Sequence, residues 1–542
     1  MRFSRSFSVL AVACIATLVG AREPDVKLPD IGSSAAAIMS PQDLHDYGAA
    51  MLQEMRAYGL VLDDALLNDY INSLGWRLVA NSDRTDMSFT FFIVRDEQIN
   101  AFAAPGGFVA ANAGLITAMQ REDELAGVLA HEISHVQQQH ILRAFEDTKK
   151  MSVPIMLGML GVLIASSHRS DDAGMAAIMT GTSMIQQRQI NFTRGEEAEA
   201  DHVGIQTLAR SGFDPTAMAG AFQTLQKIMR VNGVDVPEFL LDHPLDTKRI
   251  AEAKARAMQL KDEAADVRTK NQASMDVALM GSTLLPQLTP SAAQPLAAAS
   301  AINRGEAYFE LMRERARVLS ASSATVMRAY YADNLRDNKT FDTTANRYGY
   351  ALALTQTREP ELAVAELKKL TGGQPTSVVL RLALANAEDQ LGNKGGALKI
   401  YEQLNSDFPG NRAVTLTFAD LLLAQAETKS AHRALELLRP LVDRYSDDPE
   451  LQKSYGRANQ LAGDKVRAAE AYAEAAYLTG HAEDALNQLK ALSKQSDLTY
   501  YQRSRIDARI TQLTPTVLEL RKRGTATPPD SLAPAFACCK RR

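Results

Sequence analysis

A period of 34 to 37 residues in the second half of the chain limits its fold more than any other feature. Four alanines recur at this spacing, and each is followed four residues later by a large residue. The pairs are Ala363 with Leu367, Ala397 with Tyr401, Ala434 with Leu438, and Ala468 with Tyr472. Residues four apart share one face of a helix, so the small residue permits a close helix crossing and the large one fills the neighbouring groove. This pattern predicts stacked helical repeats that pack mainly against their neighbours.

Turn residues indicate that the helices are paired. Gly392 and Gly463 stand five residues before their alanines, where a turn between two helices belongs, and Pro409 and Pro449 mark repeat ends. A 34-residue period of paired helices is typical of tetratricopeptide (TPR) repeats. We therefore predict an all-α, TPR-like domain over 305–512, with an unrelated helical bundle as the alternative.

Length, charge and cysteine content limit the number of domains, the kinds of partner and the disulfides that we expect. The 542 residues are too many for one core, and 46% hydrophobic with 23% charged residues is ordinary for a soluble globular protein. The net charge of −5 gives no electrostatic case for nucleic-acid binding. The sequence has three cysteines, and Cys538 and Cys539 are the two that follow the first 21 residues. Because a disulfide between adjacent cysteines is strained, these two residues cannot form an ordinary structural disulfide with each other.

The N-terminus has the pattern of a signal peptide, which we assign to 1–21. Basic residues precede an apolar run over 7–18, and small residues at 19–21 provide a cleavage site. The run is shorter than the ~20 residues that a spanning helix needs. We expect export to the periplasm and cleavage, with an uncleaved membrane anchor as the alternative.

The first globular domain is predicted over 22–262. Residues 40–80 have helical spacing with Ser40 as cap, and 88–94 are rich in aromatic and β-branched residues typical of a strand. A strand pair is expected over 100–112 around the turn at 105–107, and its second strand is either a peptide-binding edge or an interior strand. Helices are then expected from Glu122, over 195–212, from Asp214, and over 246–260. A helical and Pro-rich linker (263–304) and a flexible tail (513–542) complete the predicted domains.

The sequence H-E-I-S-H at residues 131–135 lies within the helix that begins near Glu122. His131 and His135 are four residues apart, so their imidazoles share one face and can both reach one zinc ion at roughly 2.0–2.1 Å. Glu132 is displaced around the helix, from where its carboxylate can act as a general base. A catalytic zinc site needs a third protein ligand.

The acidic run from Glu196 to Asp201 supplies candidates for that ligand. Glu197 and Asp201 are four apart, which suits one ligand carboxylate and a second carboxylate that orients a ligating histidine. The alternative is a solvated helix start, where acidic residues favour the helix dipole; we assign Glu196 and Glu199 to that role.

These motifs together resemble the HtpX/Oma-type family of zinc metallopeptidases. H-E-I-S-H, E-A-E-A-D at 197–201 and the His-Pro pair at 243–244 carry the resemblance, with Thr193 replacing a serine that is frequent in the family. It implies a zincin-type α+β domain, mostly helical with a small sheet, that holds one zinc ion through His131, His135 and Glu197. The order of signal, peptidase and repeats looks like the BepA subgroup of periplasmic proteases, which implies protein substrates and an outer-membrane assembly partner.

Three further features carry hypotheses. His243 and Arg194 are candidates to stabilise the oxyanion; the alternatives are a turn for His243 and an ion pair for Arg194. His243 also suits a regulatory fourth ligand. The apolar segment 151–167 either makes a peripheral membrane or partner contact or packs over the site. His140 and His202 are expected to be surface or packing residues. A TPR chaperone with minor cleavage is the alternative function.

Overall fold

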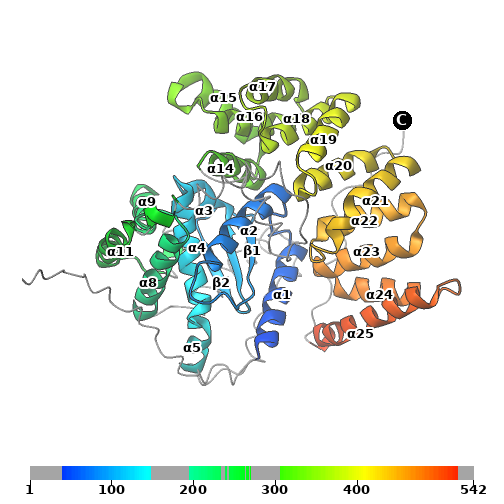
Figure 1. Cartoon of the computed structure of the whole chain (residues 1–542), viewed down its shortest axis with the longest axis horizontal. Helices are drawn as coiled ribbons and strands as arrows, with labels where there is room; N and C mark the ends of the chain where they lie inside the picture. The colour runs from blue at the N-terminus through cyan, green and yellow to red at the C-terminus, as the bar shows by residue number, and fades with distance from the viewer. Residues whose placement is uncertain are drawn as a thin grey trace, which may run out of the picture.

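The computed structural model describes residues 40–147, 194–232, 239–240, 243–262, 264–267, 269 and 306–522. The predicted signal peptide, the apolar segment 151–167, most of the linker and Cys538 with Cys539 lie outside the described residues. The described chain has two parts, a mixed α/β core and an array of helices that curves around it (Figure 1).

The helical spacing of residues 40–80 becomes two helices rather than one. α1 (Pro41–Ala57) begins at a capping box in which Ser40 and Asp43 bond each other's backbone. α2 (Ala65–Val79) is capped by the Asp64 side chain. Between them the chain pairs Val61 with Val94, so strand pairing overrides the helical spacing.

The sheet has three strands, β1 (Thr90–Val94), β2 (Ala101–Ala104) and β3 (Phe108–Asn112), in the order β1-β3-β2. β3 runs parallel to β1, pairing Thr90 with Phe108, and antiparallel to β2. Gly106 and Gly107 form the predicted turn with φ of +80° and +84°, which glycine adopts without strain. All of β3 is buried, so the second strand of the predicted pair is the interior strand and β2 is an edge.

Helices pack over this sheet and position the site. The sheet leads through α3 (Ala113–Ala118) into α4 (Glu122–Gln137), which contacts β2, β3, α8 and α9. Leu125, Val128 and Ile133 are fully buried as predicted, but the rest of α4 is almost entirely buried as well. The other helices of the core are α5 (His140–Asp147), α8 (Arg194–Arg210), α9 (Ala217–Asn232) and α11 (Thr247–Gln259).

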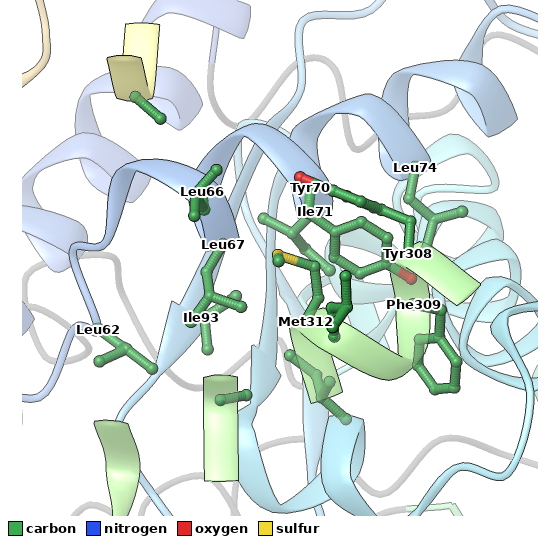
Figure 2. Close-up of a cluster of buried hydrophobic side chains, with 14 of the residues drawn as sticks. Leu62, Leu66, Leu67, Tyr70, Ile71, Leu74, Ile93, Tyr308, Phe309 and Met312 are labelled. Atoms are coloured by element: carbon green, nitrogen blue, oxygen red, sulfur yellow. The ribbon is translucent and has the colours of Figure 1, made fainter. Parts of the chain in front are cut away.

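α14 (Glu306–Ser320) joins the core to the array. It contacts α2 and α3 on one side and α16 on the other. Figure 2 shows Tyr308 and Met312 of this helix beside Tyr70 and Ile71 of α2. The rings of Tyr70 and Tyr308 lie 5.7 Å apart between centroids. One apolar cluster therefore runs from the sheet through α14 into the array.

The array consists of antiparallel neighbours in chain order, each helix packed on the next. Its elements are α15 (Ala324–Asp337), a 3-10 turn (Lys339–Phe341), α16 (Thr344–Gln356), α17 (Pro360–Gly373), α18 (Val378–Gln390), α19 (Lys394–Asp407), α20 (Arg412–Ala424), α21 (Thr428–Val442), α22 (Pro449–Ala462), α23 (Lys465–Leu478), α24 (Ala482–Ser493) and α25 (Tyr500–Lys522). The four periodic alanines are buried on alternate helices of this stack. Gly392 and Gly463 lie in turns with φ of +86° and +94°.

α25 corrects the predicted start of the tail. Residues 513–522, which the sequence assigned to it, are helical. Leu513 and Val517 are buried in an apolar cluster with α23 and α24, and this burial outweighs the polar composition of the segment.

Two arginines tie the array to α2. Arg412 of α20 lies 3.1 Å from Asp69 and 2.7 Å from Asp448, and its side chain is 9% exposed. Arg315 of α14 donates to both oxygens of Asp64 at 2.7 and 2.6 Å. Among the helices in the described ranges, none is both long enough and apolar enough to span a membrane.

Candidate metal centre

α4 places two histidines against each other. His131 and His135 are fully buried, and their Nε2 atoms lie 3.0 Å apart. Gly204 of α8 lets this helix pack closely on α4, because an added Cβ at Gly204 would lie only 3.2 Å from the His131 backbone nitrogen. A close approach of α8 to α4 thus brings the acidic residues of α8 to the histidine pair.

Glu197 is the carboxylate that reaches the pair. Its Oε1 lies 3.5 Å from His135 Nε2, and its Oε2 lies 3.5 Å from His131 Nε2. It is 1% exposed, unlike Glu196 and Glu199, which are partly exposed on the same helix. The two histidines and Glu197, which the sequence singled out as ligands, are therefore brought together.

His243 completes the cluster from a distant part of the chain. Its Nδ1 lies 2.8 Å from Glu197 Oε1 and 3.4 Å from His131 Nε2. Its Nε2 lies 3.6 Å from Glu132 Oε1. The ring stacks on Phe239, with centroids 4.7 Å apart, which fixes its orientation. One donor atom from each of the four residues His131, His135, Glu197 and His243 lies within 4.8 Å of the others.

The rear nitrogens of the two α4 histidines have partners of their own. His131 Nδ1 lies 3.0 Å from Asp201 Oδ1, and His135 Nδ1 lies 2.9 Å from His140 Nδ1. With a proton on each Nδ1, both Nε2 lone pairs face the same point. Two imidazole nitrogens and a carboxylate turned to one buried point are a set of donors that fits a transition-metal ion.

Arg249 of α11 holds the carboxylates in place. It donates to both oxygens of Asp201 at 2.7 and 2.8 Å, and its Nη1 lies 2.6 Å from Glu197 Oε2. Asp201 therefore has the orienting position predicted for it, between His131 and this arginine. Such bidentate pairs are geometrically specific as well as strong.

Charge in the cluster favours a bound cation. Burial alone would raise the pKa of Glu197, but the imidazoles of His243 and His131 outweigh burial and hold it well below its usual range. Burial lowers the pKa of His131, whereas Asp201 and Glu197 raise it, with a net rise to about 10. Burial and the neighbouring imidazoles keep the pKa of His135 well below its usual value. The carboxylates thus attract positive charge, while the lowered pKa keeps His135 neutral.

Comparison with known proteins decides the family. Residues 65–257 match the model of peptidase family M48. The beta-barrel assembly-enhancing protease of Yersinia pestis is 32% identical over 488 residues, covering 90% of this chain and 91% of that protein. The chain belongs to peptidase family M48. It is a metalloprotease that acts on protein substrates, and its cofactor is a metal ion.

Two further relatives show how far the similarity extends. The beta-barrel assembly-enhancing protease of Escherichia coli (strain K12) is 31% identical over 486 residues, again covering 90% of this chain and 91% of that protein. The mitochondrial metalloendopeptidase OMA1 of Schizosaccharomyces pombe is 27% identical over 183 residues, covering 33% of this chain and 50% of that protein. The first similarity includes the helical array, whereas the second spans only about a third of the chain.

Other residues of the M48 site differ from expectation. Arg194 is exposed at the first residue of α8, and the arginine in contact with the cluster is Arg249. Arg249 was not among the site residues predicted from the sequence. His140, expected to be a surface or packing residue, is fully buried behind His135 and contacts its Nδ1. Gln139, with φ of +56°, turns the chain between α4 and α5.

Proposed function

We propose that this M48 chain is a zinc-dependent endopeptidase of the periplasm. It degrades misfolded or stalled envelope proteins and assists the assembly of outer-membrane proteins. The observation that carries the chemistry is the buried convergence of His131, His135 and Glu197, with Glu132 beside them. The assembly role is supported by relatives named for it that cover 90% of the chain. Location in the periplasm is supported by the signal pattern of 1–21.

The metal in this proposal is one zinc ion per chain, held by His131, His135 and Glu197. When bound, zinc polarises the scissile carbonyl and lowers the pKa of water toward ~7. Glu132 takes the proton of the attacking water and passes it to the leaving amine. Asp201 and Arg249 hold His131 and Glu197 in place, so the donors need no rearrangement.

His243 has two candidate roles at this site. Its Nδ1 faces the cluster and its Nε2 faces Glu132. As a fourth ligand it would occupy the position that water needs and hold the protease inactive. As a donor from Nε2 it would stabilise the oxyanion instead. The regulatory role is favoured because one donor atom of His243 lies within 4.8 Å of donor atoms of all three proposed ligands.

We infer that substrate binds along β2. This strand is an edge of the sheet and contacts α4, which carries both histidines. An extended peptide can pair with the free side of an edge strand. The array α15–α25 supplies the protein-binding surface, and we interpret it as TPR-like because of its 34-residue period.

The experiment that tests this function compares Glu132→Gln with the wild type. The variant keeps all three proposed ligands but lacks the base. We expect full zinc content and a loss of casein cleavage of at least about 100-fold. Full zinc with unchanged cleavage would refute the role of Glu132.

The alternative function is a chaperone in which cleavage is minor. The large helical array supports this alternative, because it offers an extended surface for binding proteins. The same variant separates the two in cells. If Glu132→Gln restores outer-membrane integrity to a deletion strain as well as the wild type does, binding by the array is the main function. If it fails, proteolysis is required.

A further inference from the structure

The two ligating histidines are held from behind in different ways. His131 has Asp201, the carboxylate that an M48 site is expected to supply. The Nδ1 of His135 lies 2.9 Å from His140 Nδ1 instead. His140 is fully buried, and its own Nε2 lies 3.2 Å from Glu199 Oε2. A histidine therefore stands between the ligand and the carboxylate.

We propose that His140 is a positioning residue for the metal, acting through His135, and that Glu199 holds His140 in the required orientation. This proposal rests on the metal site proposed above. It assigns a function to two residues that are not fixed positions of the H-E-x-x-H or the E-x-x-x-D motif.

The distances allow only one consistent arrangement of protons when His135 binds through Nε2. Its single ring proton is then on Nδ1, so His140 Nδ1 must accept that hydrogen bond. The proton of His140 is consequently on Nε2, which faces Glu199 Oε2. Glu199 accepts it, and every buried ring nitrogen has a partner of the right kind.

The backbone is arranged to make this contact. α4 ends at Gln137, and Gln139 adopts φ of +56°, which is uncommon for a residue with a side chain. This turn brings His140, the first residue of α5, back against His135. Arg143, one helical turn later, also reaches Glu199 Oε2 at 3.2 Å. The start of α5 is thus attached to α8 by two side chains that share one carboxylate.

The test measures metal affinity rather than activity. Full-length His140→Leu, His140→Asn and wild type are compared by zinc competition with a chromophoric chelator and by the visible spectrum of the Co²⁺-substituted protein. Leucine removes the acceptor, whereas the asparagine oxygen can still accept from His135 Nδ1. We expect His140→Leu to bind zinc about 10–100-fold more weakly with shifted Co²⁺ bands, and His140→Asn to recover most of both.

A second pair of variants tests the outer link. Glu199→Leu removes the partner of His140, and Glu196→Gln removes a nearby carboxylate of the same helix as the control. We expect Glu199→Leu to weaken zinc binding by a smaller factor, about 3–10-fold, and Glu196→Gln to leave it unchanged.

Several results would overturn the proposal. One is zinc affinity of His140→Leu within twofold of the wild type with an unchanged Co²⁺ spectrum. A second is that His140→Leu and His140→Asn weaken zinc binding equally and also lower the thermal stability of the metal-free protein equally. That result would indicate that His140 only packs against its neighbours. If His140→Leu does not fold, the zinc affinities of His140→Asn and Glu199→Leu are compared instead. The proposal is then refuted if Glu199→Leu binds zinc as tightly as the wild type. Failure of the wild type to bind metal would refute the proposed site itself, a distinct outcome.

Discussion

The core and the helical array both bury charged side chains, but they surround them differently. In the core, His131, His135, Glu197 and His243 meet at one point, and Arg249 pairs with Glu197 and with Asp201 behind His131. In the array, buried positions are mostly alanine and leucine, and charged pairs such as Arg336 with Asp337 lie at the surface. Its buried arginine Arg412 lies where the array meets α2. Buried charge therefore gathers at the metal centre in the core, whereas the buried Arg412 of the array contributes to its attachment.

Loss of a ligand should have the largest effect on the core. Glu197→Gln replaces the carboxylate by a neutral amide, whereas Glu196→Gln makes the same change one residue away. We expect zinc affinity of Glu197→Gln to fall by more than about 100-fold, because a ligand should matter more than its supporting residues. Metal analysis after gel filtration gives the result. Equal zinc content in the two variants would contradict the assignment.

Loss of attachment should affect folding stability and leave the metal site intact. Arg412→Met leaves Asp448 buried without its partner, and breaking such a pair costs about 3–5 kcal/mol. We expect a lower unfolding midpoint with unchanged zinc affinity. Arg336→Met, at an exposed pair, is the control and should leave the midpoint unchanged. A midpoint of Arg412→Met equal to that of the control would show that the ion pairs of Arg412 do not contribute to stability.

The pH dependence of zinc affinity follows from His131. Because the folded-state pKa of about 10 is above the ordinary 6.5, the proton stabilises the metal-free fold fully below pH 6.5, and this stabilisation is lost as the pH rises through about 10. Zinc must displace that proton. We expect affinity to rise roughly tenfold per pH unit between pH 7 and 9, measured by chelator competition. Affinity that does not change over this range would contradict the raised pKa of His131.

Removal of His243 should have the smallest effect on cleavage. Whether cleavage rises or falls distinguishes the two candidate roles of this residue. If His243 blocks the position that water needs, His243→Ala should increase casein cleavage by about 3–10-fold. Zinc content should be unchanged, because three ligands remain. Unchanged or reduced cleavage would exclude the regulatory role and favour oxyanion stabilisation.

Local patterns in the sequence predicted much of this arrangement. The spacing of His131 and His135, the strand pair around Gly106, the capped start at Ser40 and the helix predicted over 246–260 all appear in the structure. Each depends on residues a few positions apart, where helix or turn geometry fixes the relation.

Contacts between distant segments could not be predicted in this way. Arg249 binds Asp201 from 48 residues away, and β1 pairs in parallel with β3 rather than with its neighbour β2. His140 was missed for a different reason. Continuing α4 past Gln137 would place it on another face, and only the turn at Gln139 brings it back to His135. A residue with a side chain at positive φ leaves little signal in a single sequence.

The central claim is that His131, His135 and Glu197 hold the catalytic zinc ion. Crystals of the full-length protein grown with zinc, measured above and below the zinc absorption edge, test it directly. The account predicts one anomalous peak per chain, at roughly 2.0–2.2 Å from Nε2 of both histidines and from a Glu197 oxygen. A fully zinc-loaded protein with its peak elsewhere, or with Glu197 turned away from the metal, would contradict it.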